Sequence, residues 1–176
     1  GNEDPRLRTR LDFDECFGTA INRFSCQAAV GEPLTPFGKG NQKRGYLPLR
    51  DSMQCLTLAL ENPPSKGEYR TFNQFEDTYT VYELAEKVKK VANELDLNAE
   101  IHRIENPRIE KEEHYYNPDH QHLLDLGYKP THDMETELKP MLADLVNNRE
   151  RILEVKDVLI PEIWWDGSKH RSKLID

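Results

Sequence analysis

The residues with the clearest chemical potential lie between Thr35 and Asp51, where the sequence reads TPFGKGNQKRGYLPLRD. Gly38 and Gly40 predict a flexible turn, and Arg44 follows at the start of an expected strand. An arginine beside a glycine turn can point its planar guanidinium at a phosphate and hold it with paired hydrogen bonds. A solvated arginine on a surface hairpin would have the same spacing, so the pattern alone leaves both interpretations open.

Other kinds of chemistry have less support. The sequence contains neither GxxxxGK[ST] nor GxGxxG, so it has no P-loop and no dinucleotide-binding fingerprint. No serine stands in a G-x-S-x-G elbow, and neither Cys26 nor Cys55 has an activating histidine nearby in sequence. One group of acidic residues and histidines resembles a set of metal ligands, but its spacing fits no known closed site, so we expect no metal. That group comprises Glu112, Glu113, His114, Asp119, His120 and His122.

The composition limits the classes of function. The chain has 176 residues, enough for one ordinary domain with a buried core. Its net charge of -8 makes it a poor general binder of nucleic acid, whose phosphates require a basic surface. No apolar run is long enough for a membrane span, and the charged N-terminus does not resemble a signal peptide. We therefore expect a cytoplasmic protein, or a stromal one in a plant or alga, with Cys16, Cys26 and Cys55 as small core residues.

Hydrophobic periodicity and turn residues predict alternating helices and strands. Thr80 and Glu83 form a capping box before the clearest amphipathic segment of the chain. Asp51 is expected to cap the helix that follows it. The apolar face of that helix comprises Met53, Leu56 and Leu60. The expected helices span residues 17–30, 51–61, 81–95, 118–126 and 133–153, and the expected strands span residues 44–50, 68–75 and 99–104.

Finer details of these elements follow from single residues. Gly31 is expected to end the first helix, with Phe17 on its apolar face, and a short extended piece is expected at residues 34–37. Asn117 is expected to cap the short helix, and Pro140 to kink or restart the last one. The order of elements predicts an α/β fold with mixed connections. Because no buried hydrophobic strand precedes residue 11, we expect the chain to be the C-terminal part of a larger protein.

The segment PLTPFGKGNQKRGYLPLRD also resembles the nucleotide-sugar segment of the extended short-chain dehydrogenases. That superfamily has the approximate pattern P-L-x-x-Y-G-x-G-x-Q-x-R-D-[YW]-L-x-V-x-D. Its second phosphate arginine corresponds to Arg108 in Asn106-Pro107-Arg108, and its closing element corresponds to residues 117–130. Within the superfamily, the chain resembles the UDP-sulfoquinovose synthases in three places. These are residues 10–31, residues 106–120, and Arg44-Gly45-Tyr46 in place of the usual Arg-Asp.

The resemblance implies a fold and a reaction. The fold is the C-terminal substrate-binding portion of an NAD(P)-binding Rossmann-like protein, with the main Rossmann sheet largely outside this chain. Residues 1–10 would be a loop left from the N-terminal domain, residues 11–155 an α/β domain that binds a nucleotide sugar, and residues 156–176 a tail. The family converts UDP-glucose and sulfite to UDP-sulfoquinovose with bound NAD, and the resemblance also implies a homodimer.

The family's catalytic groups include a Tyr-x-x-x-Lys pair, which this chain lacks, because none of its seven tyrosines has a lysine four residues later. We therefore expect no catalytic residue in this chain and NAD bound mainly by the N-terminal part. Arg44 and Arg108 are implied to clamp the diphosphate, and Thr19, which opens the helix that Gly31 ends, to meet it from the helix N-terminus. The remaining implied substrate-binding residues are Thr35 and Phe37 at the uridine and Gln42 at the ribose or a phosphate. Phe37 replaces the family's usual tyrosine, so a hydrogen bond from that hydroxyl is lost.

Two other interpretations stay open at this point. One keeps the fold and changes the reaction to that of another NAD-dependent nucleotide-sugar epimerase or dehydratase. The other is a non-catalytic α/β interaction module without a sugar site.

Overall fold

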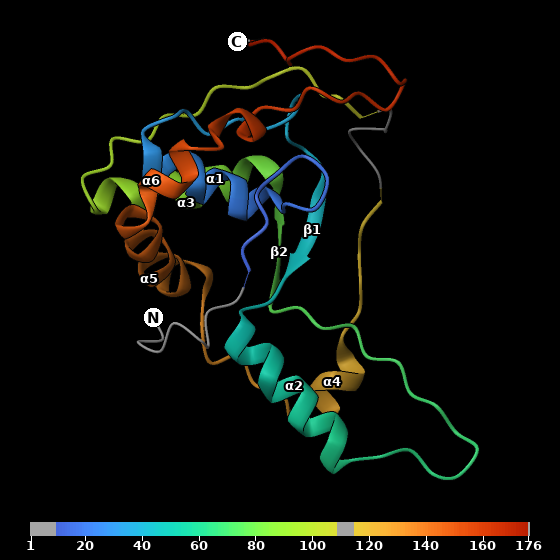
Figure 1. The fold of residues 1–176 in the computed structure, drawn as a ribbon. Helices are drawn as coiled ribbons and strands as arrows, with labels where there is room; N and C mark the ends of the chain where they lie inside the picture. Colours follow the sequence, from blue (N-terminus) through green and yellow to red (C-terminus); the bar gives the residue numbers. More distant parts are fainter. Residues whose placement is uncertain (1–9, 109–114, 176) are drawn as a thin grey trace.

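The computed structural model describes residues 10–108 and 115–175 (Figure 1). The expected N-terminal loop, except Arg10, and the candidate ligands Glu112, Glu113 and His114 lie outside the described residues. The described elements are α1 (Ala20–Val30), β1 (Lys43–Tyr46), α2 (Leu49–Glu61), β2 (Asp77–Thr80), α3 (Val81–Glu94), α4 (Gln121–Asp125), α5 (Met134–Asn147), α6 (Arg149–Leu153) and the 3-10 helix η2 (Lys156–Leu159).

Helices α1, α3, α5 and α6 form the body of the molecule (Figure 1). As predicted, Thr80 and Glu83 form a capping box at the start of α3, and Gly31 ends α1 in a left-handed conformation with φ of 78°. Phe17 precedes α1 and is exposed, so its predicted place on the apolar face is wrong. The main core lies between α1, α3 and α5 and comprises Phe24, Ala28, Leu34, Leu84, Ala85, Val88, Val91, Ala92, Ala99, Leu138 and Leu142.

Two short pairings of extended backbone flank the body. β1 and β2 are antiparallel, with Lys43 opposite Thr80 and Tyr46 opposite Asp77. The predicted extended piece at residues 34–37 is confirmed, because it pairs in parallel with residues 101–104. The predicted strand 99–104 is reduced to these isolated bridges, and the predicted strand 44–50 is shortened, because its last residues already belong to α2.

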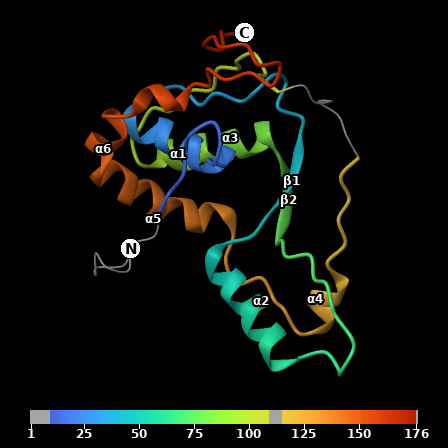
Figure 2. The ribbon, with the colours of Figure 1, turned by 45° about the vertical axis from the view of Figure 1, so that its right-hand side comes forward.

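Helices α2 and α4 with residues 62–75 form an extension below the body (Figures 1 and 2). The antiparallel strands β1 and β2 lie between the body and this extension in both views. Its small core comprises Cys55, Leu123 and Tyr128. The predicted strand at residues 68–75 is wrong, since these residues have no ladder partner in the part of the chain that the structure describes. An isolated extended segment gains no sheet hydrogen bonds, which explains why it is irregular here.

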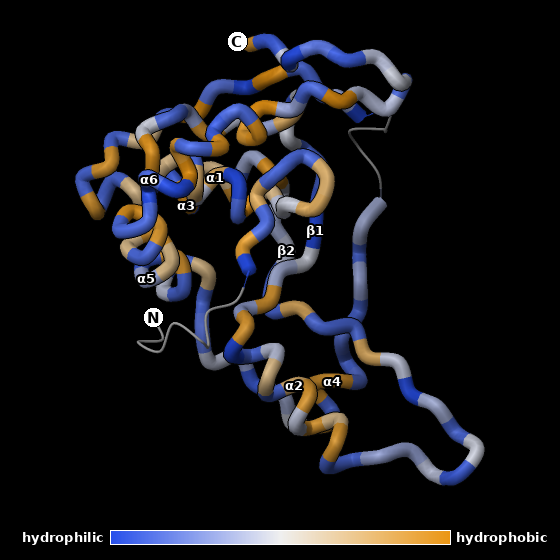
Figure 3. The backbone as a smooth tube through the Cα atoms, in the orientation of Figure 1, coloured by the Kyte–Doolittle hydropathy of each residue, from blue (hydrophilic) through white to orange (hydrophobic). Residues whose placement is uncertain are grey.

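Two predictions about α2 are also corrected. The helix begins at Leu49 after Pro48, so Asp51 lies in the first turn and caps nothing. Its buried carboxylate accepts hydrogen bonds from the Thr131 backbone N–H (3.0 Å) and the Thr131 hydroxyl, and so ties α2 to the segment after α4. The expected apolar face points to solvent instead of a core, because Met53, Leu56 and Leu60 are exposed. Figure 3 shows several hydrophobic positions along this helix.

The helices near the C-terminus differ from expectation at their ends. Helix α4 begins after His120, so Asn117 does not cap it. Pro140 lies inside α5 without restarting it, and the break comes at Asn148, between α5 and α6. Cys16 is exposed, which corrects its expected place in the core, whereas Cys26 and Cys55 are buried.

The last residues return across the body. Leu174 pairs with Ile104, and the Trp165 backbone N–H donates to the Pro107 carbonyl oxygen over 2.9 Å. Trp164 stacks on His170 with ring centroids 4.2 Å apart, and Trp165 remains exposed. No helix in the described part of the chain is long and apolar enough to cross a lipid bilayer.

Candidate functional site

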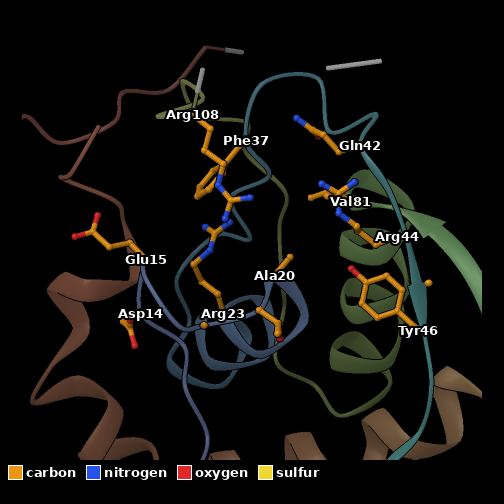
Figure 4. Close-up of a pocket in the computed structure, with 13 residues that line it drawn as sticks. Asp14, Glu15, Ala20, Arg23, Phe37, Gln42, Arg44, Tyr46, Val81 and Arg108 are labelled. Carbon is orange, nitrogen blue, oxygen red and sulfur yellow. The ribbon is translucent and has the colours of Figure 1, made fainter. Parts of the chain in front are cut away.

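A cavity of about 360 Å³ opens between the N-terminus of α1, strand β1 and the loops that contain Phe37 and Arg108 (Figure 4). Its lining is rich in arginine. The lining residues are Asp14, Glu15, Gly18, Thr19, Ala20, Arg23, Phe37, Gln42, Arg44, Gly45, Tyr46, Val81 and Arg108. Five of the six residues implied by the resemblance are in this list, although they come from segments far apart in the sequence.

Arg44 and Arg108 reach the cavity from two sides. Arg44 projects from β1, and its Nη1 donates to the Lys43 carbonyl oxygen over 2.7 Å. The Arg108 guanidinium carbon lies 5.8 Å from the ring centroid of Phe37 and 5.8 Å from that of Trp165. Arg108 therefore lines the cavity beside two aromatic rings. Two guanidiniums across one cavity are suited to an anionic group, because each offers a planar fork of N–H donors.

Thr19 and Gln42 supply the polar remainder of the predicted site. Thr19 is the N-cap of α1, and its hydroxyl accepts from the Asn22 backbone N–H over 3.4 Å. The positive end of the α1 dipole therefore opens on the cavity. Gln42 is 5% exposed, and its Oε1 has no hydrogen-bond partner within the described residues. A buried amide oxygen without a partner is costly, so it is suited to a ligand hydroxyl or N–H.

Phe37 and Thr35 differ in their placement. Phe37 lines the cavity, whereas Thr35 is buried behind it and is absent from the lining. The Thr35 hydroxyl accepts from Gln27 Nε2 over 2.7 Å and from the Arg23 guanidinium, while its backbone N–H donates to Gln27 Oε1 over 3.1 Å. Thr35 therefore acts on the cavity through Arg23.

Arg23 is a charged lining residue that sequence reasoning missed. It is 5% exposed, and its guanidinium carbon lies 4.3 Å from the ring centroid of Phe37. Burial and the charge of Arg108 lower the pKa of Arg23 to about 9, so it remains a cation at neutral pH. A sequence signal existed, because positions 20, 23, 24 and 27 share one face of α1. A charged residue on the same face as Phe24 is an exception to the core pattern.

The two acidic lining residues are engaged elsewhere. The Asp14 carboxylate accepts from the backbone N–H groups of Phe17 (2.8 Å) and Cys16 (2.7 Å), and these bonds lower its pKa. The Glu15 carboxylate accepts from the backbone N–H groups of Glu162 (2.7 Å) and Ile163 (3.0 Å). Glu15 thus fastens the C-terminal segment beside the cavity, and neither acid forms an ion pair with an arginine of the site.

Gly45 marks where β1 passes the edge of the cavity. Its backbone N–H donates to the Tyr116 hydroxyl over 2.9 Å. A Cβ atom at this position would lie 3.0 Å from the Phe75 Cβ and 3.1 Å from the Tyr116 hydroxyl oxygen. The glycine in Arg44-Gly45-Tyr46 is therefore explained by a close approach of side chains.

The structure also bears on the alternative chemistries. Within residues 10–108 and 115–175, no three His, Cys, Asp or Glu side chains are grouped to hold a metal ion. His120 stacks on Phe75, and its Nδ1 lies 2.9 Å from the Phe75 carbonyl oxygen. Burial raises the pKa of Cys26 to about 12, which disfavours the nucleophilic thiolate.

The fold is shared with solved structures. The UDP-glucuronic acid 4-epimerase of Bacillus cereus, solved with UDP-4-deoxy-4-fluoro-glucuronic acid and NAD, superimposes with a TM-score of 0.58 at 21% identity. The match covers 74% of this chain and 40% of that one. The predicted fold class is therefore confirmed: this is the α/β fold of the extended short-chain dehydrogenases of the epimerase/dehydratase type.

Sequence comparison gives a more specific resemblance within this class of fold. The chain is 50% identical over 159 residues to the UDP-sulfoquinovose synthase of Sulfolobus acidocaldarius, which covers 90% of this chain and 40% of the relative. It is 47% identical over 159 residues to the chloroplastic UDP-sulfoquinovose synthase of Spinacia oleracea, covering 90% of this chain and 33% of the relative. The predicted resemblance to the UDP-sulfoquinovose synthases is thus confirmed, and the chain spans less than half the length of these relatives. No protein-family model matches the sequence.

Proposed function

We propose that this chain is the sugar-nucleotide-binding part of an enzyme that converts UDP-glucose and sulfite to UDP-sulfoquinovose with bound NAD. The observation that carries the proposal is a cavity lined by arginines in a chain 50% identical to a UDP-sulfoquinovose synthase. The non-catalytic interaction module has no such support, because nothing in it requires buried cations around a cavity.

Arg44 and Arg108 would hold the diphosphate of UDP-glucose from opposite sides of the cavity. Charge-assisted hydrogen bonds from two guanidiniums are strong in a partly dry cleft. The N-terminus of α1 at Thr19 would add backbone N–H groups and a favourable dipole. This arrangement binds and orients the nucleotide, and the sugar would extend away from the clamp toward the catalytic groups.

The nucleoside would lie on the neutral side of the same cavity. The Phe37 ring supplies an apolar surface for a planar base, and Thr35 supports it from behind. Gln42 would accept a hydrogen bond from a ribose hydroxyl with its unpartnered Oε1. These residues position the substrate and carry no bond-making step.

NAD would be held by an N-terminal Rossmann part. The described residues do not fit NAD, because their sheet has two antiparallel strands and the sequence has no glycine fingerprint.

The extension formed by α2, α4 and residues 62–75 would dock on the N-terminal Rossmann part. Support for this comes from the apolar outer face of α2 and from the extended backbone at residues 68–75, which has no strand partner among the described residues and can complete a sheet. The exposed apolar residues of α2 are Leu49, Met53, Leu56 and Leu60.

The test is product analysis with the full-length enzyme. UDP-glucose is incubated with the enzyme, with and without sulfite, and the products are identified by mass spectrometry. We expect a sulfonated UDP-hexose only when sulfite is present. UDP-galactose or a stable 4-keto-6-deoxy sugar as the only product, unaffected by sulfite, would favour another epimerase or dehydratase. The 176-residue chain alone serves as a control and should show no turnover, because it lacks the Tyr-x-x-x-Lys pair.

A further inference from the structure

Arg23 is a buried cation without a carboxylate partner among the described residues. Its one hydrogen bond to a side chain goes to the neutral Thr35 hydroxyl, and its other contacts are the rings of Phe24 (5.1 Å) and Phe37 (4.3 Å). Taking an unpaired charge out of water is expensive, so proteins rarely bury an arginine without a paired anion. The cost of this arrangement calls for a functional explanation.

A second cation increases that cost. Arg108 approaches the same Phe37 ring, and Figure 4 shows the guanidiniums of Arg23 and Arg108 pointing toward one another beside it. Two like charges in a partly dry site repel each other. An anion bound between them would attract both and would outweigh this repulsion. Arg23 is also fixed in place, because Thr35 is held in turn by Gln27.

We propose that Arg23 is a third anion-binding arginine of this cavity, which together with Arg108 holds an oxyanion. This inference rests on the proposed function and deepens it. The oxyanion is either a phosphate of the nucleotide or free sulfite, since both present several acceptor oxygens to a planar guanidinium. Neither the sequence pattern of the superfamily quoted above nor the resemblance assigns this position.

The charge of the ligand follows from the surroundings. A neutral base could accept hydrogen bonds from Arg23, but it would leave two adjacent positive charges uncompensated. An oxyanion satisfies the remaining N–H groups and also neutralises the charge. Arg23 is therefore expected to distinguish UDP from uridine.

The test compares Arg23→Met with the matched control Arg50→Met in isothermal titrations of the full-length enzyme with UDP, uridine and sulfite. Arg50 is an exposed arginine of α2 outside the cavity. We expect Arg23→Met to weaken UDP or sulfite binding by at least about tenfold and uridine binding by less than about twofold. Loss of UDP affinity identifies the phosphate as the ligand, and loss of sulfite affinity alone identifies sulfite. Arg50→Met should leave all three affinities unchanged.

A melting temperature measured without ligand separates this role from a structural one. Because Arg23→Met removes an unpaired buried charge, the ligand-free variant should melt at the same or a higher temperature than the wild type. If the methionine variant does not fold, Arg23→Gln replaces it in the same titrations. Equal losses for UDP and uridine, or no loss for any ligand, would overturn the proposal alone. A full-length wild-type enzyme that binds neither UDP nor sulfite would overturn it together with the proposed function.

Discussion

The body and the extension each contain an amphipathic helix, but only the helix of the body has its apolar face in a core. In the body, α3 has a capping box and buries five apolar side chains against α1 and α5, namely Leu84, Ala85, Val88, Val91 and Ala92. In the extension, α2 has no side-chain cap and turns Leu49, Met53, Leu56 and Leu60 to solvent. The comparison teaches that helical periodicity identifies an apolar face but does not identify what covers it. The cavity lies in the body, at the N-terminus of α1.

The largest expected contrast concerns buried and exposed leucines. Leu84→Ala in α3 removes a fully buried side chain from the main core and should lower the free energy of unfolding by about 2–5 kcal/mol. Leu60→Ala in α2, where the side chain is 81% exposed, should cost less than about 0.5 kcal/mol. Denaturant unfolding of the chain, followed by circular dichroism, measures both values. Equal losses would show that the outer face of α2 is covered within this chain.

A smaller effect is expected from the carboxylate that holds the extension together. Burial alone would raise the pKa of Asp51, but hydrogen bonds from Thr131 and His132 outweigh it and lower the pKa to about 2. Because the folded pKa lies below the ordinary value of 3.8, the stabilisation is complete above about pH 4 and is lost as the pH falls toward 2. Its size is about 2 kcal/mol.

Asp51→Asn should therefore cost about 2 kcal/mol at neutral pH and should remove this part of the acid sensitivity. Unfolding measured at a series of pH values tests this, with Asp125→Asn on the exposed surface of α4 as the control for the loss of one charge. Hydrogen exchange should locate the loss in α2 and residues 128–131. Loss spread evenly over α1 and α3 would mean that body and extension unfold as one unit.

The smallest expected effect on the free energy of unfolding comes from the side-chain cap that α3 has and α2 lacks. Thr80→Ala breaks the bond from the Glu83 backbone N–H to the Thr80 hydroxyl (3.1 Å) and should cost about 1 kcal/mol. Thr57→Ala, an exposed position within α2, should cost nothing or stabilise slightly, because alanine is the best helix former. The same unfolding assay compares the two variants. An equal loss of unfolding free energy in both would show that the capping box does not stabilise α3.

The elements that the sequence predicted correctly have strong local signals. The apolar spacing of α3, the stop at Gly31 and the glycine turn before Arg44 needed no knowledge of distant residues. Arg44 and Arg108 were expected in one site through the resemblance, and the structure places both at one cavity. Local signals did not find Arg23, because its role depends on Phe37 and Arg108 approaching it in space.

The sequence predictions were wrong where the local structure depends on a residue or segment distant in the chain. Residues 68–75 have the composition of a strand, but strand formation requires a partner with free hydrogen-bonding groups. Asp51 has the residue type of a helix cap, but a buried carboxylate is better satisfied by Thr131, which lies eighty positions away in the chain. Such choices are made by tertiary contacts that no single segment encodes.

Gly45 also constrains how this chain can change during evolution. An aspartate there, as in the usual Arg-Asp pattern, would place its Cβ against Phe75 and the Tyr116 hydroxyl. The backbone of Gly45 is not in the left-handed region, so the barrier is steric and depends on these two neighbours. A mutational path to the Arg-Asp pattern must therefore change Tyr116 or shift the segment around Phe75 first. Gly45 and Tyr116 are therefore sterically coupled, and the effect of a substitution at position 45 is expected to depend on the residue at position 116.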